Sequence, residues 1–382
     1  MTRRRGNGDG SIYRRSDGRW AGNVQVGFKD GRRAMKVVYG KTRSEVLGKV
    51  RVAIEASRQG QIMPGRSPRL EQFLTQWLQT IEGSIRPSTF ASYSGIARNH
   101  IIPVLGRTAI DRLTVQDVAG LLARKRSEGL SSRTTQYVLF VLRNALNKAI
   151  RWGAASRNVA QLVDAPRVAH RDVNVLSPED ALRLVTAART DRLEALWILA
   201  LSTGLRRGEL LGLSWSDIDL DRRQLRVAKA LQRVTGIGLI LSETKTRRGR
   251  RSIILPIGTV EALRRHRAHQ AEDRLIAGSG WNESDFVFTS ARGTPLDGDN
   301  MISRPFARLL ERCGLPPMRF HDLRHSCASL LLAQGVAPRV VMETLGHSRI
   351  AVTLDTYTHV LPALQREAAD AMDRALGTDR NR

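Results

Sequence analysis

The sequence predicts a mainly α multidomain protein of the α+β class: a small N-terminal module with a three-stranded sheet and one helix, then two larger, mainly helical regions. Three observations carry this prediction. Alternating apolar residues near the N-terminus give way to helical periodicity, two polar segments interrupt that periodicity, and one cluster of strands breaks it again in the C-terminal half. A chain of 382 residues is long enough for two or three domains.

The first module is expected over residues 1–60, behind a basic, glycine-rich arm at residues 1–10. Its strands are expected at Ser11–Arg15, Trp20–Phe28 and Arg33–Gly40. Asp17-Gly18 and Asp30-Gly31 stand between the strands as tight-turn pairs. Thr42, with Glu45 three residues later, is a capping box that predicts the start of a helix. The apolar face of that helix is expected to consist of Val46, Val50, Ala53 and Ile54.

A helical domain is expected over residues 67–153, after a linker at Gln61–Pro68. Its first helix is predicted by i, i+3, i+4 spacing. The residues in this pattern are Leu70, Phe73, Leu74, Trp77, Leu78 and Ile81. Thr114 and Asp117 open another helix that ends near Gly129, and a long helix over Thr135–Trp152 ends at the C-cap glycine Gly153. We expect four helices in this unit and a second, polar linker at residues 154–175.

The third domain is expected over residues 175–377. Ser177-Pro178-Glu179-Asp180 is a strong helix start, because an N-cap serine precedes proline at the first position and acids in the first turn. Ala195–Leu201 is too short to span a membrane and is expected to be part of a buried helix. The remainder is predicted to be mainly helical, with strands between Gln224 and Leu255.

The charge balance predicts a polyanionic partner. The chain has 62 basic and 36 acidic residues, a net charge of +26, and 41% hydrophobic residues, which is enough for globular cores. Nucleic acid is the commonest such polyanion, and an anionic membrane surface is the competing partner. However, no apolar run approaches the ~20 residues of a membrane span, and the N-terminus has no secretory apolar segment. Cys313 and Cys327 have no metal-binding spacing, which is typical of a reducing cytosol.

Four short motifs in the C-terminal domain stand out together. They are Thr203-Gly204-Leu205-Arg206-Arg207-Gly208-Glu209-Leu210, Lys245-Thr246, His321-Asp322-Leu323-Arg324-His325, and Leu345-Gly346-His347 with Tyr357 ten residues after the histidine. In order and approximate spacing, this set resembles the catalytic signature of the tyrosine recombinases, the phage integrase family that includes lambda integrase. The family's architecture of an arm-binding module, a helical core-binding (SAM-like) domain and a catalytic domain covers nearly the whole chain.

The resemblance implies a role for each matched residue. Tyr357 would be the nucleophile that forms a 3′-phosphotyrosyl link and leaves a free 5′-hydroxyl, so rejoining would need no ATP. Arg206 and Arg324 would hold the non-bridging phosphate oxygens, for which a planar fork of donors is suited. The other assignments are His321 as proton acceptor or donor, His347 as a hydrogen-bond partner of the scissile phosphate, and Lys245 as the acid that protonates the leaving 5′-oxygen.

Several residues near these motifs have plainer interpretations. Glu209 lies one helical turn after Arg206 and would orient an arginine, although an exposed ion pair is an alternative. Arg207 adjoins Arg206 where the family pattern requires no arginine. His321 and His325 have the i, i+4 spacing of zinc-binding histidines, but the glutamate of that motif is absent. Each tyrosine, arginine, lysine or histidine taken alone would more often be structural or solvated.

No cofactor or metal is expected. Gly40-Lys41-Thr42 resembles the end of a P-loop, but position 35 is Met rather than Gly. The resemblance implies double-stranded DNA as partner, at core attachment sites and possible arm sites, a homo-tetramer on DNA, and a host bending or directionality factor. It also implies the bacterial cytoplasm, in association with the nucleoid. Two alternatives remain at this point: a type IB topoisomerase-like enzyme, and a non-catalytic DNA-binding protein of the same fold.

Overall fold

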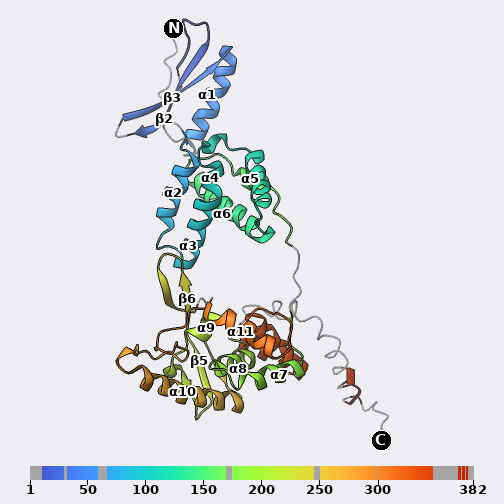
Figure 1. Cartoon of the computed structure of the whole chain (residues 1–382). Helices are drawn as coiled ribbons and strands as arrows, with labels where there is room; N and C mark the ends of the chain where they lie inside the picture. The colour runs from blue at the N-terminus through green and yellow to red at the C-terminus, as the bar shows by residue number, and fades with distance from the viewer. Residues whose placement is uncertain are drawn as a thin grey trace. The chain divides into compact units, whose positions relative to one another are not determined.

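A computed structural model describes residues 11–29, 32–58, 67–168, 174–244, 250–298, 300–346 and 369–376, the last without 371 and 375. The chain divides into two compact units, residues 1–170 and 171–382 (Figure 1). The mainly helical fold with a small N-terminal sheet confirms the predicted fold class. Among the helices that the structure describes, none has both the length and the apolarity needed to cross a membrane.

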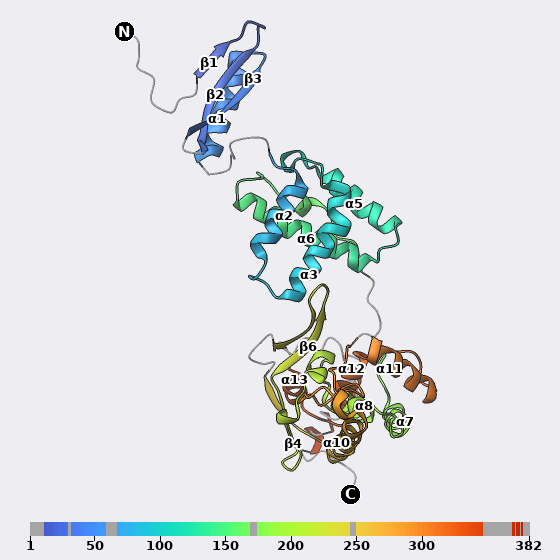
Figure 2. The ribbon, with the colours of Figure 1, turned by 60° about the vertical axis from the view of Figure 1, so that its left-hand side comes forward.

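The N-terminal sheet has the order β1-β2-β3 and is antiparallel throughout. Its strands are β1 (Ser11–Arg14), β2 (Trp20–Lys29) and β3 (Arg32–Gly40), close to the predicted bounds. Helix α1 (Arg43–Arg58) covers one face of the sheet (Figure 2). On this face Val46 and Val50 belong to one apolar cluster with Val24. The predicted cap is present, because the Glu45 amide donates to Thr42 Oγ1 over 3.2 Å. Lys41, the P-loop-like lysine, donates its amide to Glu45 at this strand-to-helix junction.

Residues 67–168 form a helical domain around one apolar core. Its helices are α2 (Leu70–Ile81), α3 (Pro87–Ile96), α4 (Ile102–Leu105), α5 (Val115–Ser127) and α6 (Ser132–Arg151), with a π turn at Ala97–Ile101 and 3-10 turns at Ile110–Arg112 and Val159–Leu162. The π turn joins α3 to α4 without a break in the helical path. The predicted caps are present: Thr114 accepts from the Asp117 amide, and Gly153 follows α6 with a φ of 70°.

The linker prediction for residues 154–175 is wrong over its first part. Ala154, Ala155, Val159, Ala160 and Val163 are buried in the core of the helical domain. Arg143 on α6 binds the carbonyls of Ala160 and Val163 at 2.9 and 2.6 Å. The segment runs as an irregular strap along α6, so its apolar residues do not follow helical spacing. Periodicity in the sequence therefore could not reveal that they are buried.

The second unit begins with three helices and two small sets of strands. They are α7 (Pro178–Ala188), α8 (Glu194–Thr203), α9 (Arg207–Leu211), β4 (Ile218–Asp219), β5 (Gln224–Val227), β6 (Lys229–Val234), β7 (Gly238–Glu243) and β8 (Arg251–Ile254), with a 3-10 turn at Trp215–Asp217. One antiparallel sheet has the order β4-β5-β8, and β6 and β7 form a hairpin. As predicted, Ser177 caps α7 by accepting from the Asp180 amide at 3.1 Å.

The remaining helices close the core around α8. They are α10 (Ile257–Ala277), α11 (Asn300–Arg312), α12 (Asp322–Ala333) and α13 (Pro338–Leu345), with a 3-10 turn at Gly278–Gly280. Helix α8 packs against α7, α10 and α12, and its Trp197 is fully buried. Because α8 is apolar on every side, it lies in the centre of this unit, as the run Ala195–Leu201 predicted. Helix α9 follows the C-terminal end of α8 after a short turn (Figure 1), and the labels of Figure 2 show α12 beside α8.

Candidate active site

The first motif turns sharply at the end of α8. Gly204 follows α8 with a φ of +60°, the left-handed conformation that glycine adopts without strain. A Cβ at this position would stand 2.3 Å from Leu345 Cδ2 on α13. Glycine is therefore required both by the backbone angle and by the close approach of α13. The turn places Arg206 at the N-terminal end of α9, where its backbone is extended.

Arg206 is held by two contacts from different parts of the chain. Its Nη1 donates to Glu209 Oε1 over 2.8 Å, and its Nη2 donates to the carbonyl of Gly346 over 3.2 Å. Gly346 ends α13 in a left-handed conformation. The Arg206 side chain keeps 43% of its surface exposed, whereas that of Glu209 keeps 5%. The guanidinium is thus fixed from one side and open on the other, the arrangement that an anion-binding arginine needs.

Glu209 is shared between two arginines. Its Oε2 accepts from Arg251 Nη2 over 3.0 Å and from the Arg206 amide over 3.1 Å. Burial raises the pKa of Glu209, but the charges and hydrogen bonds of Arg251 and Arg206 together lower it by more, so the net pKa lies below its ordinary value. The carboxylate is therefore ionised at neutral pH and binds both guanidinium groups as an anion.

The third motif begins helix α12. Arg324 is buried, with 3% of its surface exposed, and its Nη1 donates to the carbonyl of Gly204 over 2.6 Å. Asp322 is also buried and accepts from the Arg319 amide and guanidinium, each at 3.0 Å. The Arg324–Gly204 bond ties the third motif to the first, although the two lie far apart in the sequence.

His321 lies at the N-terminal end of α12 and opens onto a cavity of about 430 Å³. Arg206, Arg207 and the β6–β7 hairpin line the same cavity. Partial burial, followed by the neighbouring His325, Arg324 and Arg206, lowers the pKa of His321 to about 4. His321 is therefore neutral at pH 7 and has a ring nitrogen that can accept a proton.

The second histidine of this motif lies beside the first. The rings of His321 and His325 meet edge to face with centroids 5.4 Å apart. In the part of the chain that the structure describes, no group of three or more histidine, cysteine or acidic side chains is arranged to hold a metal ion. The zinc interpretation of this histidine pair therefore finds no third ligand among those residues.

Three of the expected site residues lie outside the described residues: Lys245, His347 and Tyr357. The described chain stops at Thr244, just after β7, and resumes at Arg250, just before β8. Both ends of this gap lie at the base of the β6–β7 hairpin. There the Thr244 amide donates to the carbonyl of Ala228 over 3.0 Å, and Glu243 pairs with Arg250. The structure brings together Arg206, His321, Arg324 and Glu209. The catalytic roles expected for these residues remain predictions.

The sequence interpretation did not single out Arg251. It stood in a run of basic residues, Arg247 to Arg251, in which a solvated charge and a buried one look alike. Its side chain is only 7% exposed, in contrast to 52% for the adjacent Arg250. The one available signal was the alternation along β8, in which Ile253 is buried and Arg251 lies two residues before it, on the same face.

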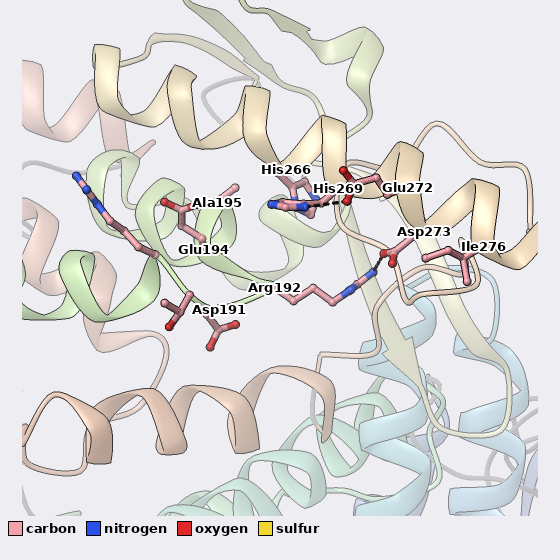
Figure 3. Close-up of a pocket in the computed structure, with 11 residues that line it drawn as sticks. Asp191, Arg192, Glu194, Ala195, His266, His269, Glu272, Asp273 and Ile276 are labelled. Carbon is pink, nitrogen blue, oxygen red and sulfur yellow. Dashed lines mark hydrogen bonds and ion pairs between the residues drawn. The ribbon is translucent and has the colours of Figure 1, made fainter.

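A second cavity, of about 400 Å³, lies between the start of α8 and α10 (Figure 3). Arg192 pairs with Asp273 at its edge, His269 pairs with Glu272, and both carboxylate oxygens of Glu194 accept from Arg265. His266 is buried and bonds the carbonyl of Val287. None of the motif residues lines this cavity, and the charged groups named here satisfy one another.

Two family models match the chain. Residues 174–363 match the phage integrase family, and residues 69–124 match the N-terminal SAM-like domain of phage integrases. A tyrosine recombinase XerC-like protein of Caldanaerobacter subterraneus is 30% identical over 90% of this chain and 93% of its own length. An integrase of Saccharopolyspora erythraea is 29% identical over 96% of both chains.

Solved structures show the same fold. The integrase of the transposon Tn1549, in complex with a circular intermediate DNA, superposes with a TM-score of 0.67 at 23% identity, over 79% of this chain and all of that chain. A lambda integrase tetramer bound to a Holliday junction gives a TM-score of 0.57 at 21% identity, over 92% of this chain and 96% of that chain. The extent of the 30% identical relative, together with the two family models, shows that the chain belongs to the phage integrase family of tyrosine recombinases.

Proposed function

We propose that this chain is a site-specific integrase of a phage or other mobile element, which cuts and rejoins double-stranded DNA through a 3′-phosphotyrosyl link to Tyr357. One observation carries the proposal: a half-exposed Arg206, held by Glu209, faces the same cavity as a neutral His321. Arg324 is tied to the turn that carries Arg206. These groups match what a phosphate diester requires, namely positive charge for its oxygens and an acceptor for a proton.

The proposed cleavage step transfers one phosphoryl group. The phenol oxygen of Tyr357 forms a bond to phosphorus, and the bond from phosphorus to the 5′-oxygen breaks. The phenol proton passes to His321 or to water, and the 5′-oxygen takes a proton from Lys245. Rejoining is the same exchange in reverse with a 5′-hydroxyl as nucleophile, so the energy of the diester is kept in the phosphotyrosine.

In this step Arg206 and Arg324 stabilise the charge on the non-bridging oxygens. Removing one such donor from an enzyme costs about 10²–10³ in rate, which is the scale of effect expected for either arginine. His347 donates a hydrogen bond to the same phosphate. A guanidinium group is a permanent cation in proteins, so the positive charge is present throughout the reaction.

The first module is proposed to lay its open sheet face on DNA. On the face away from α1, Tyr13, Met35, Val37 and Tyr39 are 40–54% exposed, and cross-strand pairing places Tyr13 and Tyr39 on either side of Ala21. Arg15 lies over the Tyr39 ring, 5.5 Å from its centroid. An exposed face of aromatic, apolar and basic groups is suited to sugar, base and phosphate contacts. Core sites would be bound by the other two domains, 67–153 and 175–377.

Strand exchange between two duplexes needs four cuts, so four copies of the chain are proposed to assemble on DNA. The lambda integrase relative is a tetramer on a Holliday junction. A host bending or directionality factor is proposed to set the direction of the reaction, in the cytoplasm at the nucleoid. The net charge of +26 supports association with DNA there.

The test is covalent attachment to a nicked duplex that carries the core site, whose sequence is read from the junctions of the integrated element. The full chain is expected to form a denaturation-resistant adduct in the presence of excess EDTA. Tyr357→Phe removes one hydroxyl and should bind the duplex equally well but form no adduct. An adduct that persists in Tyr357→Phe would refute the assignment of the nucleophile. Activity that needs a divalent ion would refute the arginine account.

A further inference from the structure

Arg251 is a buried arginine that joins two parts of the site. Its Nη2 donates to Glu209 Oε2 over 3.0 Å, and its Nε donates to the carbonyl of Thr344 over 2.6 Å. Glu209 is the carboxylate that also holds Arg206, and Thr344 lies in the last turn of α13. Carbonyls in the last turn of a helix have no partner within the helix, so a guanidinium donor there fixes the helix end.

We propose that Arg251 is a positioning residue for the recombination reaction: its guanidinium, buried between Glu209 and the Thr344 carbonyl, sets both the orientation of Arg206 and the end of α13. The inference rests on the proposed function, because it assumes that Arg206 binds the scissile phosphate. The chain runs from Thr344 through Gly346 to His347, so a helix end fixed by Arg251 also fixes the starting point of the segment that carries His347.

The charge on Glu209 explains why its second partner matters. With both arginines present, Oε1 accepts from Arg206 and Oε2 accepts from Arg251. Without Arg251, and among the residues that the structure describes, Arg206 would be the one cation paired with a carboxylate that is 5% exposed. A buried anion with a single cation binds that cation more tightly. The Arg206 guanidinium would then be drawn toward Glu209 and away from the phosphate, while the end of α13 would lose its donor.

The chain offers a matched control in Arg265. Arg265 also donates two guanidinium hydrogen bonds, at 3.2 and 2.8 Å, to a glutamate whose side chain is only 10% exposed, Glu194. This pair lies at α8 and α10, beside the cavity that contains none of the motif residues. Arg265→Met therefore removes an arginine–glutamate pair from the same unit without touching Glu209 or α13, although the Arg265 side chain is 48% exposed and that of Arg251 is 7% exposed.

The experiment compares the full chain with Arg251→Met, Arg251→Lys and Arg265→Met on the nicked core-site duplex. Three quantities are measured: the Kd for the duplex, the adduct-forming rate at saturating duplex, and the melting temperature.

A small displacement of a reacting group costs about 10²-fold in rate, so Arg251→Met should lose ~100-fold in rate at saturation. Its Kd should stay within ~3-fold, because the interaction lost acts on the reaction rather than on binding. Arg251→Lys keeps a charge beside Glu209 and should recover ~10-fold of that rate.

A modified duplex separates positioning of Arg206 from loss of structure. A methyl group in place of one non-bridging oxygen of the scissile phosphate removes the charge that Arg206 would neutralise. On this probe the rate defect of Arg251→Met should shrink by ~10-fold or more relative to the unmodified duplex. A variant that is merely less folded would show the same defect on both duplexes.

The outcomes separate a failure of the role given to Arg251 from a failure of the proposed function. The inference holds if Arg251→Met loses rate while Arg265→Met, with a similar fall in melting temperature, stays within ~3-fold of the parent. It is overturned if the two methionine variants react equally fast, or if Arg251→Lys is as slow as Arg251→Met and both have the same defect on the two duplexes. A parent chain that forms no adduct at all overturns the proposed function itself.

Discussion

At the scale of single residues, the site combines fixed cations with a histidine that partial burial, helped by its charged neighbours, keeps neutral. Burial and the surrounding His325, Arg324 and Arg206 lower the pKa of His321, so the free protein holds this ring without a proton at pH 7. A bound phosphate would place negative charge beside the same ring and shift its pKa upward. In the proposed function, this upward shift would let the ring take up a proton when a DNA phosphate is bound.

This arrangement gives a pH dependence of stability in the free protein. In the unfolded chain a histidine has a pKa near 6.5, whereas His321 in the folded chain has a pKa of about 4. Between these values the unfolded state binds more protons, so the stabilising contribution is complete above pH 6.5 and is lost as the pH falls toward 4. His321→Gln should therefore show a smaller fall in melting temperature between pH 7 and pH 5 than the parent.

The matched control for this measurement is His269→Gln, which removes an exposed ring that pairs with Glu272 on α10. Its ring lies outside the cluster of arginines around His321, so the substitution leaves that cluster unchanged. If His321→Gln loses melting temperature as steeply as the parent, then other groups with a lowered pKa, among them the buried His266 and the partly buried His100 and His325, account for the acid slope.

Individual residues also show how much of the site can be predicted from the sequence. Arg206, His321 and Arg324 were predicted because each stands in a motif with fixed neighbours. Arg251 was not, because burial of an arginine depends on which segments fold against it, here Glu209 and the end of α13. Spacing within one strand cannot encode a contact with a helix carbonyl 93 residues later, because only the folded domain brings the two segments together.

At the scale of elements, α8 and α13 meet closely at Gly204, where an added Cβ would stand 2.3 Å from Leu345 Cδ2. Gly204→Ala would force a residue with a Cβ into a left-handed backbone, which costs about 1 kcal/mol of folding free energy. The new Cβ would also crowd Leu345, which costs a further ~1–3 kcal/mol. We expect an increased sensitivity to urea that corresponds to about 2–4 kcal/mol, with reduced adduct formation because Arg206 follows two residues later.

The control for this junction is Gly236→Ala in the β6–β7 turn. Gly236 also has a positive φ, +82°, but a Cβ there meets nothing within 4 Å. It should cost only the backbone term of about 1 kcal/mol. Equal urea midpoints for the two variants would mean that Leu345 moves aside without cost, and that close packing is not what fixes the turn.

The helical domain gives a second test at this scale, in the strap that sequence periodicity did not reveal. Asn158 is 5% exposed, and its Nδ2 donates to the carbonyl of Arg143 and to Asn147 Oδ1 at 2.9 and 2.8 Å. Asn158→Ala removes these two bonds and the buried one in which Asn158 Oδ1 accepts from the Ala160 amide, and should cost about 1–3 kcal/mol in urea unfolding. Gln161 also binds Asn147 but is exposed, so Gln161→Ala should stay within about 0.5 kcal/mol. Equal effects would show that the strap contributes little.

The elements that were predicted and the one that was missed differ in a physical way. Ser177, Thr42 and Thr114 start helices through side-chain bonds to the chain three residues later, so a local pattern carried the information. The strap at residues 154–163 is held by Arg143 and by burial against α6, which are contacts between segments. Its polar residues and Pro166 gave the pattern of a linker, and only the folded domain shows that its apolar residues are covered.

At the scale of the whole molecule, the sequence predicts an assembly element beyond Tyr357. Leu361, Leu364, Ala368, Ala371, Met372, Ala375 and Leu376 fall at near-helical spacing. The described residues between 369 and 376 are helical, and Met372 and Leu376 are 59% and 68% exposed. Large apolar side chains that remain exposed on a helix are available to a second copy of the chain. The alternative is that the segment folds back on its own domain.

Truncation after His359 separates these two possibilities. If the segment packs on a neighbouring copy, the truncated chain should bind a single core site as tightly as the parent but form no tetramer on paired sites, because only the contact between copies is lost. Gel-shift titration gives the affinity, and light scattering of the DNA complexes gives the number of copies.

Met372→Glu in the full chain is the companion variant, since it keeps the segment but places a charge on its apolar stripe. If the segment instead folds back on its own domain, the truncated chain should lose melting temperature and still form tetramers. Tetramers from both variants would place the assembly contact elsewhere in the molecule.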